Sequence, residues 1–146
     1  MWALSVRAVH DASQGGVEEL LAAAKAAQAN SYSPYSRFPV GAAIRTGSGR
    51  VFTGANYENA AYPQGVCAEG SAIGAMVTAG ERVIVEVLTV ADGEHLTTCC
   101  GGCRQKLREF ATPDVPVHAA GPEGVRRTFT LGELLPEAFG PEQLDR

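Results

Sequence analysis

The sequence lacks any long uninterrupted apolar run, and this absence excludes one class of protein. Nowhere in the 146 residues do eighteen apolar residues follow one another, so we expect no transmembrane helix. The first ten residues, MWALSVRAVH, place an arginine among short apolar pieces and do not have the pattern of a secretory signal. We therefore expect a cytoplasmic protein with no membrane partner.

The sequence also lacks an excess of positive charge. It has 12 basic and 16 acidic residues, which give a formal net charge of -4. A protein that binds the phosphate backbone normally carries a basic stripe on its surface. The balance of charges therefore argues against a nucleic-acid partner.

No internal repeat, low-complexity tract or linker divides the chain, so we expect one domain over residues 1–146. The hydrophobic pattern predicts helices within 15–30 and at 67–79 and 101–110, and strands at 40–46, 51–55, 83–92, 115–120 and 125–130. In the second helix, Gly70 and Gly74 are expected to form a close-packing face. We expect the strand at 83–92 to be central and parallel because it is almost continuously apolar. The result is a single α/β domain with a mixed five-stranded sheet flanked by helices. Residues 131–146 are predicted to form a loosely attached tail.

Four cysteines are present in a chain without a predicted secretion signal, which favours thiols or metal ligands over disulfides. Cys67 is predicted to begin one helix, and Cys100 and Cys103 begin the next. Both helices follow strands of the same sheet, so their N-termini should meet at one edge. Three thiolates leave one corner of a zinc tetrahedron vacant, and in catalytic sites this corner holds water.

Two other interpretations of the CGGC motif remain open from the residues alone, namely a redox pair and half of a structural zinc site. A structural site needs a fourth ligand. The candidates are Cys99, His10, His95 and His118, and none of them has the paired spacing of a zinc knuckle. Glu69, two residues after Cys67, favours the catalytic interpretation, because beside an open zinc corner it is a natural proton carrier. On its own, a glutamate in the first turn of a helix is ordinary capping.

Four sequence blocks together resemble the cytidine deaminase family, in its short form with a three-cysteine zinc site. They are SYSPYSRFPVGAA, GANYENAAYP, VCAE and CGGCRQKLREF, and they occur in register over about residues 20 to 141. The resemblance implies a cytidine deaminase-like layered sandwich, one Zn²⁺ per subunit, a homotetramer and a role in pyrimidine salvage. It implies the hydrolysis of cytidine and deoxycytidine to uridine and deoxyuridine.

By this resemblance, Cys67, Cys100 and Cys103 bind the metal and Glu69 is the general acid/base. Zinc-bound hydroxide would attack C4 of the base while Glu69 carries protons to N3 and to the leaving amino group. The resemblance assigns six residues to substrate binding, namely Phe38, Asn56, Glu58, Ala60, Tyr62 and Ala68. It places Tyr62 and Phe139 at contacts with neighbouring subunits, and the tail at 131–146 near such a contact.

Without the resemblance, Asn56 and Glu58 would be read as a polar loop and Phe38 as core. In the family, the asparagine and the glutamate bind the ribose hydroxyls, in particular the 3′-OH. A carboxylate there would repel a 3′-phosphate, so we expect a free pyrimidine nucleoside as the substrate.

The sequence departs from the family pattern at two positions. Gly70 stands where many members have an arginine that offsets thiolate charge, so the helix ends or another cation, such as Arg104, must compensate. Cys99 stands where the family has proline, and we expect it to have no metal role.

Two rival functions follow from the same residues. One is the deamination of another aminopyrimidine nucleoside with the same zinc chemistry, although intact Asn56 and Glu58 favour an ordinary ribose. The other is a non-catalytic zinc-binding or redox module. The presence of Glu69 beside three convincing ligands, and not four, speaks against such a module.

Overall fold

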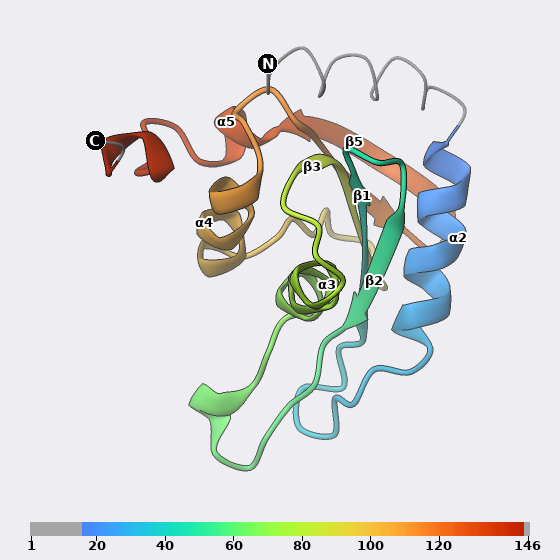
Figure 1. Ribbon diagram of the computed structural model, residues 1–146. Coiled ribbons are helices and arrows are strands. Elements are labelled where there is room, and N and C mark those ends of the chain that lie inside the picture. The colour runs from blue at the N-terminus through green and yellow to red at the C-terminus, as the bar shows by residue number, and fades with distance from the viewer. Residues whose placement is uncertain (1–15, 145–146) are drawn as a thin grey trace.

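The computed structural model describes residues 16–144, and a five-stranded sheet with the order β2-β1-β3-β4-β5 forms its centre (Figure 1). The strands are β1 (Val40–Thr46), β2 (Val51–Ala55), β3 (Ile84–Ala91), β4 (Pro116–Gly121) and β5 (Gly124–Thr130). The helices are α2 (Val17–Gln28), α3 (Ala68–Thr78), α4 (Gly101–Phe110) and α5 (Leu131–Leu134), with 3-10 turns at Tyr62–Gln64 and Pro141–Gln143. The predicted α/β fold is confirmed, and each predicted helix and strand lies within a few residues of its expected position.

The sheet is mixed, as expected, but the direction predicted for its central strand was only half right. β3 pairs in parallel with β4 on one side and antiparallel with β1 on the other. β1 also pairs antiparallel with β2, and β4 with β5. The reason is that the β1–β2 hairpin lies against β3 through its first strand. All eight residues of β3 are buried, which explains why this strand is apolar on both faces.

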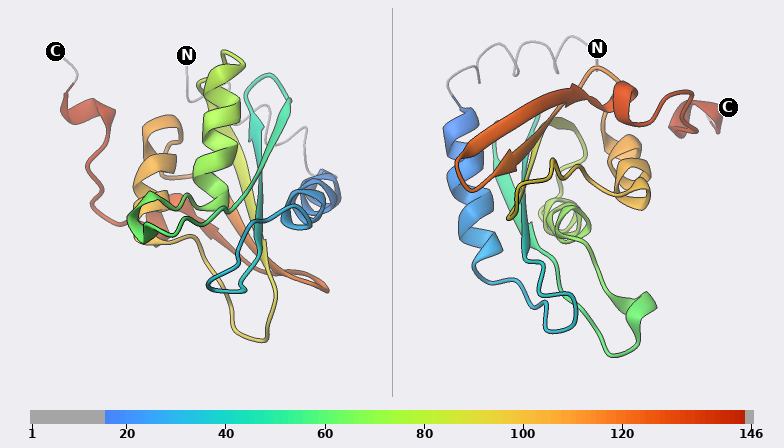
Figure 2. Two further views of the ribbon diagram at one scale, coloured as in Figure 1. Left: turned by 90° about the horizontal axis from the view of Figure 1, so that it is seen from below. Right: turned by 180° about the vertical axis from the view of Figure 1, so that it is seen from behind.

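Helices cover both faces of the sheet, so the molecule has three layers (Figure 2). Helix α2 lies on one face, where Leu20 and Ala24 pack against Ala43, Leu88 and Val90. Helices α3 and α4 lie on the other face, over a larger cluster that includes residues of β1, β3 and β4. The acidic residues of α2 are in its first turn and Lys25 is in its last, an arrangement that complements the helix dipole.

Glycine allows α3 to pack closely on the sheet, although not at the predicted positions. We expected Gly70 and Gly74 to form a close-packing face. A Cβ at Gly70 would lie 3.2 Å from Val66 Cγ1, so that approach is close, but Gly74 is exposed and a Cβ there would meet nothing within 4 Å. The close approach is at Gly54 of β2. A Cβ at Gly54 would lie 2.4 Å from the carbonyl oxygen of Ala68 and 2.4 Å from the amide nitrogen of Ala72. The helix therefore rests directly on the backbone of β2.

The first part of the C-terminal tail is integrated into the fold, which corrects the prediction of a loosely attached segment. Leu131 and Leu134 of α5 are buried in the core under α4. The hydroxyl of Thr130 accepts a hydrogen bond from the amide of Glu133 and caps this short helix. Further along, Arg108 of α4 forms an ion pair with Glu142. Two apolar side chains and an ion pair thus hold the tail against the domain.

No helix within residues 16–144 has the length and apolarity that a membrane crossing requires. The N-terminal decapeptide that we interpreted as lacking a secretory signal lies outside the described residues, and so does His10.

Candidate metal centre and active site

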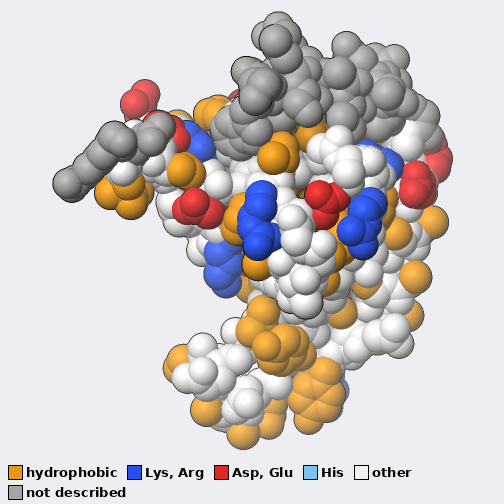
Figure 3. Space-filling model, viewed as in Figure 1, with side chains coloured by type: hydrophobic (Ala, Val, Ile, Leu, Met, Phe, Trp, Pro, Cys, Tyr) orange, Lys and Arg blue, Asp and Glu red, His pale blue; other side chains and the backbone are white. Residues whose placement is uncertain are grey.

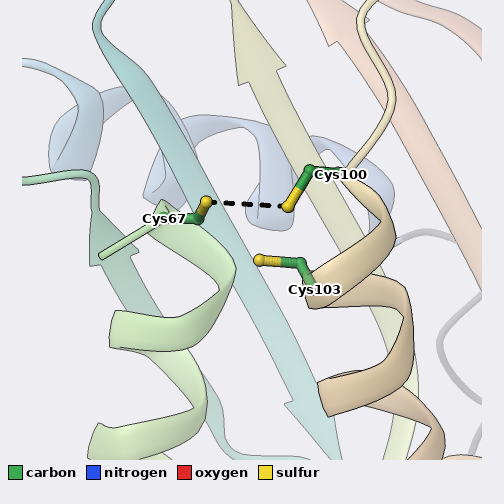
Figure 4. Close-up of side chains that lie close together, drawn as sticks. All are labelled: Cys67, Cys100 and Cys103. Atoms are coloured by element: carbon green, nitrogen blue, oxygen red, sulfur yellow. Dashed lines mark hydrogen bonds between the residues drawn. The ribbon is translucent and has the colours of Figure 1, made fainter. Parts of the chain in front are cut away.

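The strand directions bring the starts of α3 and α4 to one edge of the sheet. β2 and β3 are both antiparallel to β1, so they run in the same direction and end at the same edge. α3 begins after the loop that follows β2, and α4 begins after the loop that follows β3. The helix N-termini lie side by side, as the sequence predicted, with Cys67 and Cys100 as the residues that precede the first helical turns (Figure 4).

The three cysteine sulfurs form a compact cluster at these helix ends. The sulfur atoms of Cys67, Cys100 and Cys103 all lie within 4.8 Å of one another, and the Sγ atoms of Cys67 and Cys100 are 3.8 Å apart. Zinc bonded to sulfur at about 2.3 Å in a tetrahedron places two sulfurs about 3.8 Å apart. Thiolates are also donors that zinc prefers. The donor set and its spacing therefore fit a zinc ion with three protein ligands.

The surroundings of the cluster disfavour three thiolates unless a cation joins them. Burial raises the pKa of Cys67, and burial together with the charge of Glu69 raises the pKa of Cys103. Burial also acts to raise the pKa of Cys100, but hydrogen bonds with the backbone and thiol of Cys103 outweigh it and lower this pKa. A bound divalent cation would oppose the rise for Cys67 and Cys103 and lower the pKa of Cys100 further, because it stabilises all three thiolates directly.

The other residues considered as a fourth ligand lie away from the cluster or have other partners. Cys99 is 2% exposed and packs in the apolar core, and burial raises the pKa of its thiol to about 11. The two ring nitrogens of His118 contact Glu86 and Thr128. His95 is not in the cluster either. The described residues thus supply three ligands, which leaves the fourth corner to water or substrate.

Glu69 lies beside the cluster in the first turn of α3 and is 3% exposed. The hydroxyl of Thr89, on β3, donates a hydrogen bond to Glu69 Oε1 at 3.2 Å. A buried carboxylate next to a metal site is well placed to move protons.

A pocket of about 300 Å³ opens at this edge. Seven of the residues singled out in the sequence line it: Phe38, Asn56, Glu58, Cys67, Ala68, Glu69 and Cys100. The remaining lining residues are Ser36, Val40, Thr89, Thr97 and Thr98. The structure therefore brings residues from four separate sequence blocks to one cavity, with Cys67, Cys100 and Glu69 in its wall and Cys103 buried behind them.

Asn56 and Glu58 hold the loop at residues 31–38 against the end of β2. Asn56 Oδ1 accepts hydrogen bonds from the Val40 amide at 2.8 Å and the Ser31 hydroxyl at 2.5 Å, and its Nδ2 donates to the Phe38 carbonyl at 3.0 Å. Glu58 Oε1 accepts from the Tyr35 amide at 2.9 Å.

The hydroxyl of Ser36 also donates to Glu58. This hydrogen bond is the main cause of the lowered pKa of Glu58. Glu58 therefore presents a carboxylate at the pocket.

Three residues that the resemblance associated with the substrate or a neighbouring subunit do not line this pocket. Ala60 is exposed, and Tyr62 and Phe139 are 73% and 57% exposed. Tyr62 lines an adjoining pocket and packs against Tyr35 with ring centroids 5.5 Å apart. Apolar side chains gather on the projecting loops at residues 31–38 and 57–66, at the bottom of Figure 3, whereas Phe139 belongs to the C-terminal tail at the upper left of the same view. Exposed large aromatic residues of this kind are typical of protein contacts.

Gly70 lies in the first turn of α3, beside the Lys106 side chain of α4. A Cβ at Gly70 would be 3.2 Å from Val66 Cγ1 and 3.5 Å from Lys106 Nζ. Arg104, which we considered as a compensating cation, does not reach the sulfurs. Its guanidinium donates to the carbonyl oxygens of Cys99 at 2.9 Å and Leu134 at 2.7 Å. The cation beside Gly70 is therefore the ammonium of Lys106.

Comparison with known proteins decides the family. The model described as "Cytidine and deoxycytidylate deaminase zinc-binding region" matches residues 16–119. The chain belongs to the cytidine deaminase family. The cytidine deaminase of Sporosarcina psychrophila is 41% identical over 128 residues, which are 88% of this chain and 94% of that relative. The cytidine deaminase of Mycobacterium tuberculosis H37Rv is 40% identical over 121 residues, 82% of this chain and 86% of the relative.

Solved structures agree with this family. The crystal structure of cytidine deaminase from Burkholderia pseudomallei matches with a TM-score of 0.79 and 39% identity, over 84% of this chain and 98% of that chain. The resemblance stated from the sequence blocks is thus confirmed, and so is the fold class. The family is defined by a zinc-binding region, and in this cytidine deaminase homologue three cysteines are positioned to hold the ion.

Sequence reasoning missed five residues of the pocket wall. Thr97 and Thr98 directly precede the cysteine pair, so their proximity to the metal site was a signal that could have found them. Ser36 and Val40 flank Phe38 and could have been found in the same way. Thr89 had no such signal, because a threonine in an apolar strand is ordinary.

Proposed function

We propose that this protein catalyses the zinc-dependent hydrolytic deamination of cytidine and deoxycytidine to uridine and deoxyuridine, with release of ammonia. The observation that carries this proposal is that Glu69 and the three-cysteine cluster line or border one pocket. Membership of the cytidine deaminase family supports it, as do relatives named cytidine deaminase that align over most of their length.

Cys67, Cys100 and Cys103 would hold one zinc ion per chain. When bound, zinc supplies a Lewis acid that makes water acidic near neutral pH. The protein contributes two helix N-termini, whose partial positive charge favours thiolates at this place. The ammonium of Lys106, on the next turn of α4, lies beside Gly70, the position at which many family members carry an arginine.

Glu69 would act as the general acid/base. Its carboxylate accepts a proton from the water that attacks C4 and delivers this proton to N3 of the pyrimidine. It then carries the proton of the new C4 hydroxyl to the amino group, so that the C4–N bond breaks, ammonia leaves and C4 becomes a carbonyl. The burial of Glu69 supports this role, because electrostatic interactions between the carboxylate and the reacting atoms are stronger in a site from which water is largely excluded.

The remaining pocket residues would bind the nucleoside. Phe38 packs against the base, and the backbone of Ala68 faces the pyrimidine carbonyl. Asn56 and Glu58 bind the ribose hydroxyls, with Glu58 as a carboxylate acceptor for the 3′-OH. Ala60 and Tyr62, on the loop that follows, would complete the site from its rim.

The test of the proposed function is the loss of cytidine absorbance after protein is added. We expect turnover by the zinc-loaded protein and the accumulation of uridine and ammonia in equal amounts. A chelator should abolish turnover and added zinc should restore it. An unchanged cytidine spectrum with zinc-loaded, folded protein would contradict the proposal.

Larger-scale features complete the proposal. Residues 1–146 would form one domain that assembles into a homotetramer, with the tail at 131–146, Phe139 and Tyr62 near subunit contacts. The exposure of both aromatic rings supports such contacts. Light scattering should give a mass of four chains.

The four free thiols support a reducing, cytoplasmic location, where the activity would serve pyrimidine salvage without a nucleic-acid partner.

A further inference from the structure

The buried hydroxyl of Thr89 has one partner, and that partner is the carboxylate of Glu69. Thr89 Oγ1 donates to Glu69 Oε1 at 3.2 Å, and the two residues are 2% and 3% exposed. Among residues 16–144, Thr89 is the only hydrogen-bond donor that contacts this carboxylate.

A hydroxyl buried on this strand destabilises the fold unless it forms a hydrogen bond. All eight residues of β3 are buried, and a buried hydroxyl needs an acceptor to offset its lost hydration. A valine would fill the same volume on this strand without that requirement. Thr89 also borders the pocket in which Glu69 and Cys67 lie. Its hydroxyl is therefore at the reacting end of the cavity and not in the core below it.

The hydrogen bond fixes how the carboxylate is presented. The last torsion of a glutamate side chain is broad, with no strongly preferred angle. A donor held on Oε1 removes this freedom and leaves Oε2 for proton exchange. Threonine suits this task because its branched side chain is stiff and because β3, which carries it, is the buried central strand of the sheet.

We propose that Thr89 is a positioning residue for Glu69. It does not react, and it sets the orientation in which Glu69 exchanges protons with water and the pyrimidine. This inference rests on the proposed deaminase function.

Two variants of Thr89 separate the hydroxyl from the shape of the side chain. Thr89→Val keeps the volume and removes the donor, and Thr89→Ser keeps the donor. We expect Thr89→Val to lower kcat about tenfold, because small errors in the placement of a catalytic group reduce the rate strongly. KM for cytidine, zinc content and melting temperature should stay at wild-type values. Thr89→Ser should restore most of kcat.

A second arm tests whether the effect runs through Glu69. In a Glu69→Ala background, Thr89→Val should have no further effect on the residual rate, because the group that it positions is absent. An unchanged kcat in Thr89→Val, a rise in KM in place of a fall in kcat, or an equal loss in both backgrounds would each overturn the proposal. Failure of Thr89→Ser to rescue would do the same.

A spectroscopic arm does not depend on turnover. The carboxylate bands of Glu69 are identified in the infrared difference spectrum between wild type and Glu69→Ala, both loaded with zinc. Thr89→Val should shift these bands and Thr89→Ser should return them to their wild-type position. Bands that stay in place in Thr89→Val would overturn the positioning role. Wild-type protein that fails to deaminate cytidine would instead contradict the proposed function.

Discussion

Two glutamates border the pocket, and their surroundings equip them for different tasks. Glu69 is buried beside the cysteine cluster and bonded to a single hydroxyl. Glu58 accepts hydrogen bonds from the backbone and the hydroxyl of the 35–36 turn, which lower its pKa. The first arrangement suits proton transfer, and the second suits a permanent negative charge that recognises a hydroxyl.

The proton-transfer role predicts a clear separation of metal binding from catalysis. Glu69→Ala should keep one zinc per chain, because Glu69 is not among the three sulfur ligands. It should lower kcat by about 100-fold or more, the usual contribution of general acid/base catalysis. Metal analysis and cytidine turnover on the same sample check this. Near-normal turnover of a zinc-loaded variant would remove Glu69 from the mechanism.

The charge of Glu58 predicts discrimination against a 3′-phosphate. Cytidine 3′-phosphate should be deaminated with a kcat/KM about 100-fold below that of cytidine, because like charges in contact cost several kcal/mol. Glu58→Gln should reduce the ratio of the kcat/KM for cytidine to that for cytidine 3′-phosphate, because a neutral amide repels the phosphate less than a carboxylate does. Efficient deamination of the 3′-phosphate by the wild type would show that Glu58 does not face the 3′-OH.

Predictability at the residue scale followed the chemical distinctiveness of each residue. Cysteines at helix starts and Glu69 in the first turn could be placed from the sequence, because metal ligands recur at characteristic intervals along a chain. Thr89 could not, because its hydroxyl gains meaning only when β3 is set against α3. The structural role of Asn56, which forms hydrogen bonds with Ser31, Val40 and Phe38, also could not be predicted from the sequence.

At the scale of elements, the metal site depends on how closely α3 lies on β2. Gly54 permits backbone contact with Ala68, the residue after the proposed ligand Cys67. Sequence reasoning placed the close contact on Gly70 and Gly74 because they recur at helical spacing. It was wrong for Gly74, although Gly70 does lie close to Val66, because spacing identifies a face of a helix but not the neighbour that this face meets.

This packing predicts opposite outcomes for two glycine substitutions. Gly54→Ala should force α3 away from the sheet, destabilise the fold by about 1–3 kcal/mol and weaken zinc binding. Gly74→Ala, on the exposed side of the same helix, should leave zinc affinity unchanged and stabilise the helix by about 1 kcal/mol. Urea unfolding and competition with a chromogenic chelator measure both quantities. Tight zinc binding in a well-folded Gly54→Ala would contradict this view of the site.

A buried polar network crosses the face of the sheet that α2 covers, opposite to α3 and α4. Glu86 on β3 contacts Arg45 of β1 at 3.4 Å and His118 of β4 at 2.8 Å. Burial acts to raise the pKa of Glu86, but the hydrogen bonds and charges of His118 and Arg45 outweigh it and lower the pKa. A lowered pKa means that the charge of Glu86 stabilises the fold above about pH 4.3, its ordinary value. This contribution is lost as the pH falls through the lowered pKa.

The network predicts a pH-dependent stability difference. Glu86→Gln should reduce the free energy of unfolding at pH 7 by about 3 kcal/mol, because it leaves a buried arginine without its full partner. The difference should shrink in acid, where the wild type loses the same charge. Urea unfolding from pH 7 to pH 3 checks this, with the exposed Glu109→Gln as a control. A constant difference over this range would show that charge is not the cause.

At the scale of the whole molecule, the sequence predicted the order of elements and the mixed sheet but not the attachment of the tail. Polar residues between Leu131 and Arg146 suggested a loose end, whereas Leu131 and Leu134 fill the core under α4. Two apolar residues in a four-residue helix give too little periodicity to be recognised. The sequence likewise did not show that the exposed aromatic rings of the loops at 31–38 and 57–66 lie together on one surface, because the fold brings these loops side by side (Figure 3).

The central claim is that Cys67, Cys100 and Cys103 hold the zinc on which cytidine turnover depends, whereas the adjacent Cys99 does not. Cys99→Ala and Cys100→Ala differ by one position in the chain, so the pair tests this claim directly. The measurement is zinc bound per chain and cytidine turnover for both variants. Cys99→Ala should keep one zinc and wild-type turnover, and Cys100→Ala should lose both. Equal losses in the two variants, or full turnover in Cys100→Ala, would contradict the account.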